Sequence, residues 1–431
     1  MPWGSETSSR QHPGPVRGRV KIPGSKSVSH RALIAAALAS GVSVLDNLLI
    51  CEDTLYTVHG LKELGAKISL ERQRAQVWGT GGRFCRNTRR KEIFLGNSGT
   101  SYRLLLSVCA LAQGEYVLTG TARMRQRPVG GLVSALRDLG VKVSCREREG
   151  FPPVLVRAGG IKGGGTRIRG IESSQYVSSL LLSGPYMNDG LRIQILEKQV
   201  SRPYIGITVN LMEDFGVRVE RSGDSIYGVR PGKRYSARHY VVEGDVSSAS
   251  YFWAAAAVTG GTVVTENIAP FVTVQGDIAL LDILEDMGCV VTREANKVTV
   301  RGNPLTGVDV DMGSLPDMVP TLAAIAPFAK GRTVIRNVSH LRHKESDRLQ
   351  AIVTQWRRLG IPVEELDDGI IIRGVQGDLK GACVDPHGDH RIAMSLAVIS
   401  LNVPALLIKD NGCVGKSFPT FWQLWQPLAR G

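Results

Sequence analysis

The stretch GSKSVSHRALIAAALASG, residues 24–41, joins a polar and cationic start to an almost wholly apolar continuation. Lys26, His30 and Arg31 crowd the start, whereas residues 32–39 are all apolar. A helix that is apolar nearly all round is a buried helix, and its N-terminus already carries about half a positive charge. Cations placed at that end therefore predict a bound anion.

Five further segments repeat this design. Each begins with Ser, Thr or Asp, which alone is ordinary helix capping, and continues as an apolar run that predicts a buried helix. The segments are TSYRLLLSVCALAQG from Thr100, SSQYVSSLLLSGP from Ser173, SSASYFWAAAAVTGG from Ser247, DMVPTLAAIAPFAKG from Asp317 and DHRIAMSLAVISL from Asp389.

A second series of helices ends in glycine, and a strand-like run follows each glycine. Its members are LKELG (61–65), LRDLG (136–140), MEDFG (212–216), LEDMG (284–288) and WRRLG (356–360). Successive glycines lie 75, 76, 72 and 72 residues apart. A helix-stopping glycine before a strand is typical of a helix–turn–strand unit. The two series together predict an α/β fold of about six βαβαββ repeats, three per domain.

The two chain ends indicate how the repeats divide into domains. Only 30 residues follow Leu401, so the sixth repeat is cut short, and GRVKIPG (18–24) is a strand without a repeat of its own. We therefore expect the N-terminal strand to complete the last repeat. This predicts a discontinuous domain, 1–24 plus 244–431, and an inserted domain, 25–243.

Two further segments add charge to the helix starts. In ARMRQRPVGG (122–131) three arginines alternate, so an extended strand would put Arg123, Arg125 and Arg127 on one face. In LRHKESDRL (341–349) Lys344 and Arg348 lie one helix turn apart, which predicts either an anion-binding face or a solvated charged helix. Helix N-termini with nearby Lys and Arg form anion sites.

Asp317 heads the apolar run in SLPDMVP and is the carboxylate that we expect to act as a base. Partial burial tunes the pKa of such a group, and a positioned base contributes about 10²–10⁴-fold in rate. The alternative is that Asp317 merely caps its helix.

Composition restricts the partners. The chain has 431 residues and a formal net charge of +14, which predicts two or three domains and anionic partners. Seven cysteines without a C-x-x-C motif, and no long apolar segment, favour a cytoplasmic protein without membrane contact.

The ordered motifs resemble those of one family. PGSKSVSHRAL, GNSGTSYRLL, RMRQRPVG, SSQYVSSLLL, SRPYI, GDVSSASYFWAAA, LPDM, HKESDRL, GDHRIAMSLAV and GKSFPTF occur in the order seen in 5-enolpyruvylshikimate-3-phosphate synthases, from about Val16 to Trp425. The last two motifs look more like the second bacterial class of that family.

This resemblance implies a fold and a reaction. The fold is a two-domain inside-out α/β barrel, with helix N-termini facing the interdomain cleft. The reaction transfers the enolpyruvyl group of phosphoenolpyruvate to the 5-hydroxyl of shikimate 3-phosphate and releases phosphate, by addition and elimination. No metal and no organic cofactor is implied, and we expect a monomer that binds no nucleic acid.

The resemblance also assigns residues. Asp317 matches the base that takes the 5-hydroxyl proton, Glu345 matches the proton donor to the methylene carbon, and Lys26 lies near both substrates. Shikimate 3-phosphate is assigned to Lys26, Ser27, Arg31, Ser173, Ser174, Gln175, Ser201, Asp317 and Lys344. Phosphoenolpyruvate is assigned to Lys26, Gly99, Arg127, Gln175, Arg348, Arg391 and Lys416.

Two positions depart from the family pattern. Leu104 stands where many members have proline, which bears on how the Gly99 turn is held and on inhibitor sensitivity. His340 stands where asparagine is frequent, which puts that substrate contact in doubt.

Three alternatives remain. The sister transferase acting on UDP-N-acetylglucosamine shares the fold, but its loop cysteine has no counterpart in TARMRQRP. A basic repeat RNA-binding protein would suit the charge, but aromatic residues are only 6% and do not interleave with the basic ones. A metal hydrolase would use His387 and His390, which lack a third ligand nearby.

Overall fold

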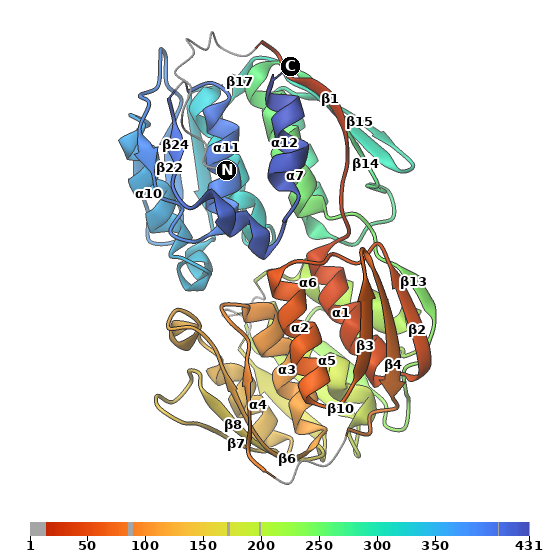
Figure 1. Cartoon of the computed structure of the whole chain (residues 1–431). Coiled ribbons are helices and arrows are strands. Elements are labelled where there is room, and N and C mark those ends of the chain that lie inside the picture. The colour runs from red at the N-terminus through yellow and green to blue at the C-terminus, as the bar shows by residue number, and fades with distance from the viewer. Residues whose placement is uncertain (1–13, 85–88, 170–172, 198–199, 404, 431) are drawn as a thin grey trace.

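A computed structural model of the chain describes residues 14–84, 89–169, 173–197, 200–403 and 405–430. Helices and short sheets alternate along the chain and gather into two groups, one above the other in Figure 1. The α-helices are α1 (Lys26–Leu38), α2 (Glu52–Glu63), α3 (Gly99–Ala110), α4 (Gly130–Asp138), α5 (Ser174–Ser183), α6 (Pro203–Asp214), α7 (Val246–Thr259), α8 (Leu280–Asp286), α9 (Val319–Ile325), α10 (Arg348–Arg358), α11 (His390–Ser400) and α12 (Phe421–Arg430).

The strands form separate small sheets that share one plan. In each four-stranded sheet two strands pair in parallel, and a hairpin of two further strands pairs antiparallel with one of them. Three such sheets are β13 (His239–Val241)-β2 (Ser40–Asp46)-β4 (Arg74–Thr80)-β3 (Lys67–Glu71), β5 (Lys91–Phe94)-β6 (Gln113–Thr119)-β8 (Val154–Gly159)-β7 (Lys142–Cys145), and β11 (Glu220–Ser222)-β12 (Ile226–Val229)-β10 (Leu191–Ile195)-β9 (Gly164–Ile168).

The remaining strands belong to the other group of elements. They form the sheets β1 (Arg17–Lys21)-β14 (Thr262–Glu266)-β16 (Lys297–Arg301)-β15 (Val290–Glu294) and β18 (Asp309–Asp311)-β20 (Arg332–Arg336)-β22 (Ile370–Arg373)-β21 (Val363–Glu365), and the pairs β17 (Leu305–Thr306)-β19 (Ala329–Lys330) and β23 (Cys383–Val384)-β24 (Leu407–Ile408). Among the described residues every sheet has two open edges, so the barrel-like shape comes from separate sheets around buried helices.

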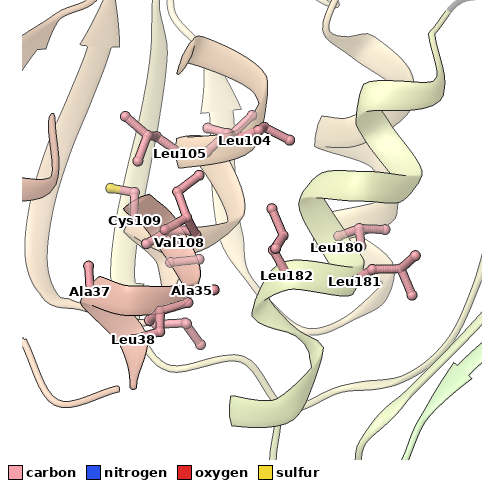
Figure 2. Close-up of a cluster of buried hydrophobic side chains, with 14 of the residues drawn as sticks. Ala35, Ala37, Leu38, Leu104, Leu105, Val108, Cys109, Leu180, Leu181 and Leu182 are labelled. Carbon is pink, nitrogen blue, oxygen red and sulfur yellow. The ribbon is translucent and has the colours of Figure 1, made fainter. Parts of the chain in front are cut away.

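All six predicted buried helices are present, as α1, α3, α5, α7, α9 and α11. Each has nearly all of its residues buried, and Figure 2 shows buried side chains that α1, α3 and α5 contribute to one apolar cluster, among them Leu38, Leu105 and Leu182. Burying a leucine side chain stabilises the fold by about 1.5–3 kcal/mol. These helices therefore form the interior, and their N-terminal residues are fixed by the packing behind them.

The buried helices begin at the polar residues that the sequence indicates. Ser25, Ser98, Ser173, Asp245 and Asp389 are the N-caps of α1, α3, α5, α7 and α11, and each side chain accepts a backbone N–H of the first turn. Helix α9 differs, because Pro316–Met318 form a 3-10 turn before it and Asp317 caps nothing. The capping interpretation of Asp317 is wrong, which leaves its carboxylate free for other partners.

The apolar core is split into two clusters. One contains only residues between Val28 and Val242, and we call this part the first half. The other combines Val16–Ile22 with residues from Val246 to Leu428, and we call this part the second half. We propose domain boundaries at residues 24 and 244, because Gly24 and Gly244 pair in an isolated β-bridge between the two clusters.

The N-terminal strand differs from its prediction. Strand β1 pairs in parallel with β14, from Arg17 beside Thr262 to Lys21 beside Glu266, and so completes the fourth repeat rather than the sixth. Among the described residues the sixth repeat consists of the β23–β24 pair, the buried helix α11 between these strands, and α12. Helix α12 lies against β1, since a Cβ atom at Gly18 would come within 2.6 Å of Leu428.

Candidate active site

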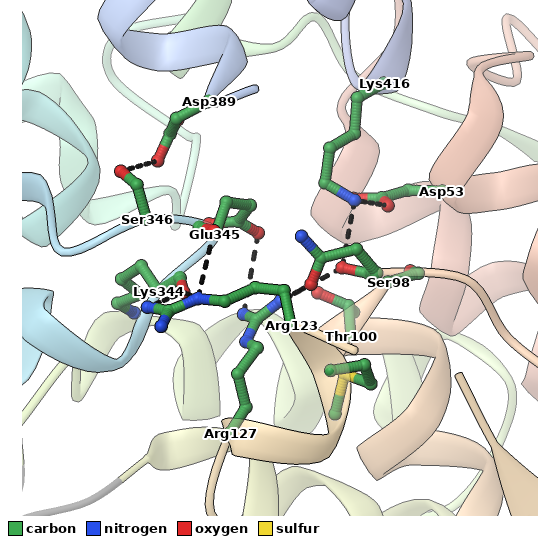
Figure 3. A network of polar contacts seen from close by, with 12 residues as sticks. Asp53, Ser98, Thr100, Arg123, Arg127, Lys344, Glu345, Ser346, Asp389 and Lys416 are labelled. Atoms are coloured by element: carbon green, nitrogen blue, oxygen red, sulfur yellow. Dashed lines mark hydrogen bonds and ion pairs between the residues drawn. The ribbon is translucent and has the colours of Figure 1, made fainter. Parts of the chain in front are cut away.

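The polar ends of the buried helices meet where the two halves face each other. Figure 3 shows this cluster, with Arg127 and Asp53 from the first half and Glu345, Asp389 and Lys416 from the second. All five side chains are at least nine-tenths buried. Buried charges persist only when they are paired or bind a ligand, so the partners of each group indicate its role.

Asp317 is held by charges on both of its oxygens. Arg348 Nη1 lies 3.0 Å from Oδ1 and Arg391 Nη2 lies 2.5 Å from Oδ2. The Tyr204 hydroxyl, which comes from the first half, donates to Oδ2 at 3.0 Å. Burial raises the pKa of the Asp317 carboxyl, but Arg391 and Arg348 outweigh it and hold that pKa well below its usual range. Asp317 is therefore ionised.

Arg348 connects three carboxylates. Besides Asp317, its guanidinium donates to Glu345 Oε2 at 2.9 Å and to Asp389 Oδ2 at 2.8 Å. The residue is only 1% exposed. Burial lowers the pKa of Arg348, but the three carboxylates overcome this and raise it. Arg348 thus holds the network of the second half together.

Glu345 also meets the first half. Its Oε1 lies 3.5 Å from Arg127 Nη2, and Arg127 Nη1 donates to the Asn97 carbonyl at 3.0 Å. Burial raises the pKa of the Glu345 carboxyl, but Arg127 and Arg348 hold it well below its usual range. Gly99 leaves room for this arginine, because a Cβ atom there would lie 2.5 Å from Arg127 Nη2 and would displace the guanidinium.

The arginine segment does not form the expected extended strand. Residues Met124–Gln126 form a 3-10 turn, because the Gln126 N–H donates to the Arg123 carbonyl and the Arg127 N–H donates to the Met124 carbonyl. The turn buries Met124 in the core. Arg123 and Arg127 reach the second half, where Arg123 donates to the Lys344 carbonyl at 2.9 Å, but Arg125 pairs with Glu147 at the surface.

Two lysines from opposite halves share one aspartate. Lys26, at the start of α1, lies 3.1 Å from Asp53 Oδ2, and Lys416, from the second half, lies 2.5 Å from Oδ1. Burial lowers the pKa of Lys26, but Asp53 and other carboxylates outweigh it and raise that pKa. The sequence analysis missed Asp53, since an acid in the first turn of α2 is what the helix dipole alone favours.

Arg31 is buried among neutral groups. Its Nε donates to Thr208 Oγ1 at 2.7 Å and its Nη1 donates to the Ser27 carbonyl at 2.8 Å; Ser178 and the Tyr204 carbonyl accept the remaining bonds. Within the described ranges no carboxylate pairs with Arg31, and burial lowers its pKa to about 10. A buried positive charge without a counter-charge indicates a place for an anion.

The remaining predicted residues lie at the same end of the first half. Ser173 caps α5, and Ser174 is 3% exposed. Gln175 accepts from Arg103 at 2.9 Å and donates to Thr100 at 2.9 Å. Ser201 has a left-handed backbone, with φ of 54°, and its N–H donates to the Gly313 carbonyl of the second half at 2.9 Å.

Lys344 and Arg348 are not one helix turn apart, as the sequence suggested. Ser339–His343 form a 3-10 turn, and α10 begins only at Arg348, with Asp347 as its N-cap. The solvated-helix interpretation is wrong, because Arg348 is buried and Lys344 is largely covered. Burial lowers the pKa of Lys344 to about 8 and the pKa of nearby His340 to about 3.

Leu104 and the two histidines of the hydrolase alternative occupy ordinary positions. Leu104 is fully buried on α3, one turn behind the Gly99 end (Figure 2). His390 is buried, whereas His387 is exposed and contacts Gln355. The described residues contain no group of three His, Cys, Asp or Glu that could hold a metal ion. None of the helices described is both long and apolar enough to cross a bilayer.

Comparison with known proteins agrees with this geometry. The sequence profile of a family described as EPSP synthase (3-phosphoshikimate 1-carboxyvinyltransferase) matches residues 10–425. The chain is 42% identical over 409 residues to a 3-phosphoshikimate 1-carboxyvinyltransferase of Trichormus variabilis, covering 95% of each protein. It is 42% identical over 419 residues to the protein of that name from Sulfurovum, covering 96% of this chain and 97% of the relative.

A solved structure shares the whole fold. An EPSP synthase from Acinetobacter baumannii superposes with a TM-score of 0.80 at 29% sequence identity, covering 96% of both chains. The predicted fold class, a two-domain inside-out α/β architecture, is thereby confirmed. The chain belongs to the EPSP synthase family.

Proposed function

We propose that this chain transfers the enolpyruvyl group of phosphoenolpyruvate to the 5-hydroxyl of shikimate 3-phosphate and releases phosphate. It is a transferase of the shikimate pathway, which leads to aromatic amino acids. Family membership supports the reaction. The meeting of buried Arg and Lys side chains from both halves supports the site, because both substrates are polyanions and charge-assisted hydrogen bonds contribute about 1.5–3 kcal/mol each.

The shikimate 3-phosphate site belongs mainly to the first half. Arg31 supports this assignment most strongly, because its charge is buried without a carboxylate. The site comprises Lys26, Ser27, Arg31, Ser173, Ser174, Gln175, Ser201, Asp317 and Lys344.

The phosphoenolpyruvate site lies between the halves. Here every arginine that we assign already bonds to the protein's own oxygens, and we propose that the substrate replaces some of those partners. The site comprises Lys26, Gly99, Arg127, Gln175, Arg348, Arg391 and Lys416.

When the substrate replaces these protein partners of the arginines, its binding also changes the pKa values of the catalytic carboxyl groups. When Arg348 and Arg391 turn toward the substrate, Asp317 loses the positive charges that depress its pKa and becomes a stronger base. Loss of Arg127 and Arg348 raises the pKa of Glu345 in the same way, which lets it carry a proton. The substrates therefore create the base and the acid that the reaction needs.

The protons balance over the two steps. In the addition, the 5-hydroxyl oxygen bonds to C2 of phosphoenolpyruvate, Asp317 takes the hydroxyl proton, and Glu345 gives a proton to C3. In the elimination, Glu345 takes a proton back from C3 and the C2–O bond to phosphate breaks. The leaving phosphate receives the proton held by Asp317. Lys26 stabilises the negative charge on both substrates.

The observation that carries this proposal is the Arg391–Asp317–Arg348 arrangement, in which one carboxylate lies between two cations suited to an anionic substrate. The test is release of inorganic phosphate from both substrates, with UDP-N-acetylglucosamine as the control acceptor. We expect phosphate with shikimate 3-phosphate only. Release with the control acceptor alone, or with neither, contradicts the proposal.

We also propose that the enzyme acts in the cytoplasm and binds no nucleic acid, and that it is a monomer, since one chain supplies both sides of the site. Sedimentation of the active protein tests the monomer. Activity that appears only in a sedimenting dimer contradicts it.

A further inference from the structure

A second buried carboxyl group, Asp277, lies beside the proposed base and has no part in the mechanism above. It belongs to a 3-10 turn, Gly276–Ala279, and is 4% exposed. The Tyr204 hydroxyl lies 3.4 Å from its Oδ2 and 3.0 Å from Asp317 Oδ2. One phenol hydroxyl therefore stands between two carboxyl groups and has one proton to donate.

The two carboxyl groups have opposite surroundings. Asp317 is paired with two arginines, whereas in the described part of the chain Asp277 has no ion pair and receives a hydrogen bond from the Ser247 hydroxyl. A buried carboxyl without a cation favours its neutral form. Two carboxyl groups in such contrasting environments are typical of acid–base sites.

The packing holds this arrangement in place. Gly276 lies against Pro203 at the start of α6, where any Cβ atom would overlap the proline ring. Tyr204 follows that proline, so the turn that carries Asp277 also fixes the position of the phenol. The groups that face Asp277 are Tyr204 from α6, Asp245 and Ser247 from the start of α7, Asp317 from the turn before α9 and Arg391 from α11.

We propose that Asp277 is a positioning residue that controls proton transfer at Asp317 through the hydroxyl of Tyr204. While Asp277 is neutral, the phenol donates its proton to Asp317 and weakens it as a base. When Asp277 ionises, it competes for the phenol proton and adds a like charge nearby. Both effects make Asp317 a stronger base, and proton abstraction by a weak base becomes faster as its basicity rises.

Asp277 should change its protonation state near neutral pH. Burial, together with Asp317, raises the pKa of Asp277 to about 7. This inference rests on the proposed transferase activity, and it predicts that the enzyme gains kcat as the solution passes from about pH 6 to about pH 8. Substrate phosphates also titrate there, so the informative quantity is the ratio of wild-type to variant kcat, in which substrate ionisation cancels.

The decisive variant is Asp277→Asn, which keeps the shape and fixes the neutral form. We expect a kcat ratio near unity at about pH 6 that rises several-fold by about pH 8, with both KM values unchanged. A ratio that stays constant with pH, whether near unity or high, overturns the inference, because a merely structural role would lower kcat equally at every pH.

A second measurement does not depend on activity. Infrared difference spectra of the wild-type protein should show a carboxylic acid band that disappears between about pH 6 and pH 8 and is absent from Asp277→Asn. Ser247→Ala removes a bond to the ionised form and should move this titration to higher pH. A band that titrates without transferase activity refutes the proposed function alone, whereas an absent band refutes the role of Asp277.

Discussion

Arg31 and Arg348 are both 1% exposed, yet their surroundings are opposite. Arg31, in the first half, bonds only to hydroxyl and carbonyl oxygens, and its pKa is lowered to about 10 by burial. Arg348, in the second half, binds three carboxylates, which raise its pKa against the effect of burial. At these two positions the first half keeps a positive charge available, while the second half neutralises its own.

This difference separates two ways of binding an anion. A ligand that meets Arg31 adds a missing counter-charge to a fixed set of donors. A ligand that meets Arg348 or Arg391 instead competes with Asp317 or Glu345 for the guanidinium, and in doing so it changes the basicity of the groups that perform the chemistry. We infer that the first half serves recognition and the second half links binding to proton transfer.

The largest effect on kcat should come from replacing Asp317, the proposed base, which belongs to the second half. Asp317→Asn should lower kcat by about 10²–10⁴-fold and change both KM values little, because the amide cannot take the hydroxyl proton. Asp309→Asn is the matched control, since Asp309 is an exposed aspartate paired only with Arg336. Steady-state phosphate release measures both variants. Full kcat in Asp317→Asn would remove this residue as the base.

The two arginines should also differ in what they contribute to folding. Arg348→Met leaves buried Asp389 without its arginine and removes one of the two cations of Asp317 and of Glu345, so it should cost about 3–5 kcal/mol of unfolding free energy. Arg31→Met leaves only neutral acceptors, and it should cost about 1–3 kcal/mol. Urea unfolding of both variants gives the comparison. An equal or larger loss for Arg31→Met would contradict the assignment of compensated and uncompensated charge.

The repeats explain why so much of the fold follows from the sequence. The apolar runs and the terminal glycines at 65, 140, 216, 288 and 360 reflect local requirements, burial and helix termination, and both appear in the structure. The partner of β1 is a different matter, because the sequence shows that the sixth repeat is short but does not show which strand lies beside β1. Only the three-dimensional path of the chain places β1 beside β14.

Removing a substrate contact from each site should raise KM for a different substrate. Arg31→Met should raise KM for shikimate 3-phosphate, and Arg127→Met should raise KM for phosphoenolpyruvate, each by about 10–100-fold for the loss of a charge-assisted bond. Each variant serves as the control for the other, because both remove one buried guanidinium. If either variant changes the two KM values alike, the sites are not divided in this way.

The smallest effect concerns pH. Because burial lowers the pKa of Lys344 to about 8, its ammonium loses a proton as the solution becomes more alkaline. Deprotonation removes a positive charge, so KM for shikimate 3-phosphate should rise a few-fold above about pH 8. Lys344→Arg should keep its charge and show no such rise. Identical KM profiles of the two proteins would show that Lys344 does not contact the phosphate.

The site was less predictable than the fold, for a physical reason. Motif residues such as Arg391 and Asp317 stand at helix starts, and the sequence indicates their positions. Asp53, Asp277 and Tyr204 matter through contacts between distant segments: Lys416 with Asp53, and Tyr204 with Asp317 across the two halves. Spacing along the chain carries no signal for such contacts.

The central claim is that the arginines exchange their carboxylate partners for the substrates. The most direct test is a crystal structure of the protein with shikimate 3-phosphate and an unreactive analogue of phosphoenolpyruvate. We predict that Arg31 contacts the first ligand and that Arg391 and Lys416 contact the second. Asp317, released from at least one arginine, should lie beside the 5-hydroxyl. Ligands bound elsewhere, or an Asp317 still paired with both arginines while both ligands are in place, would contradict the account.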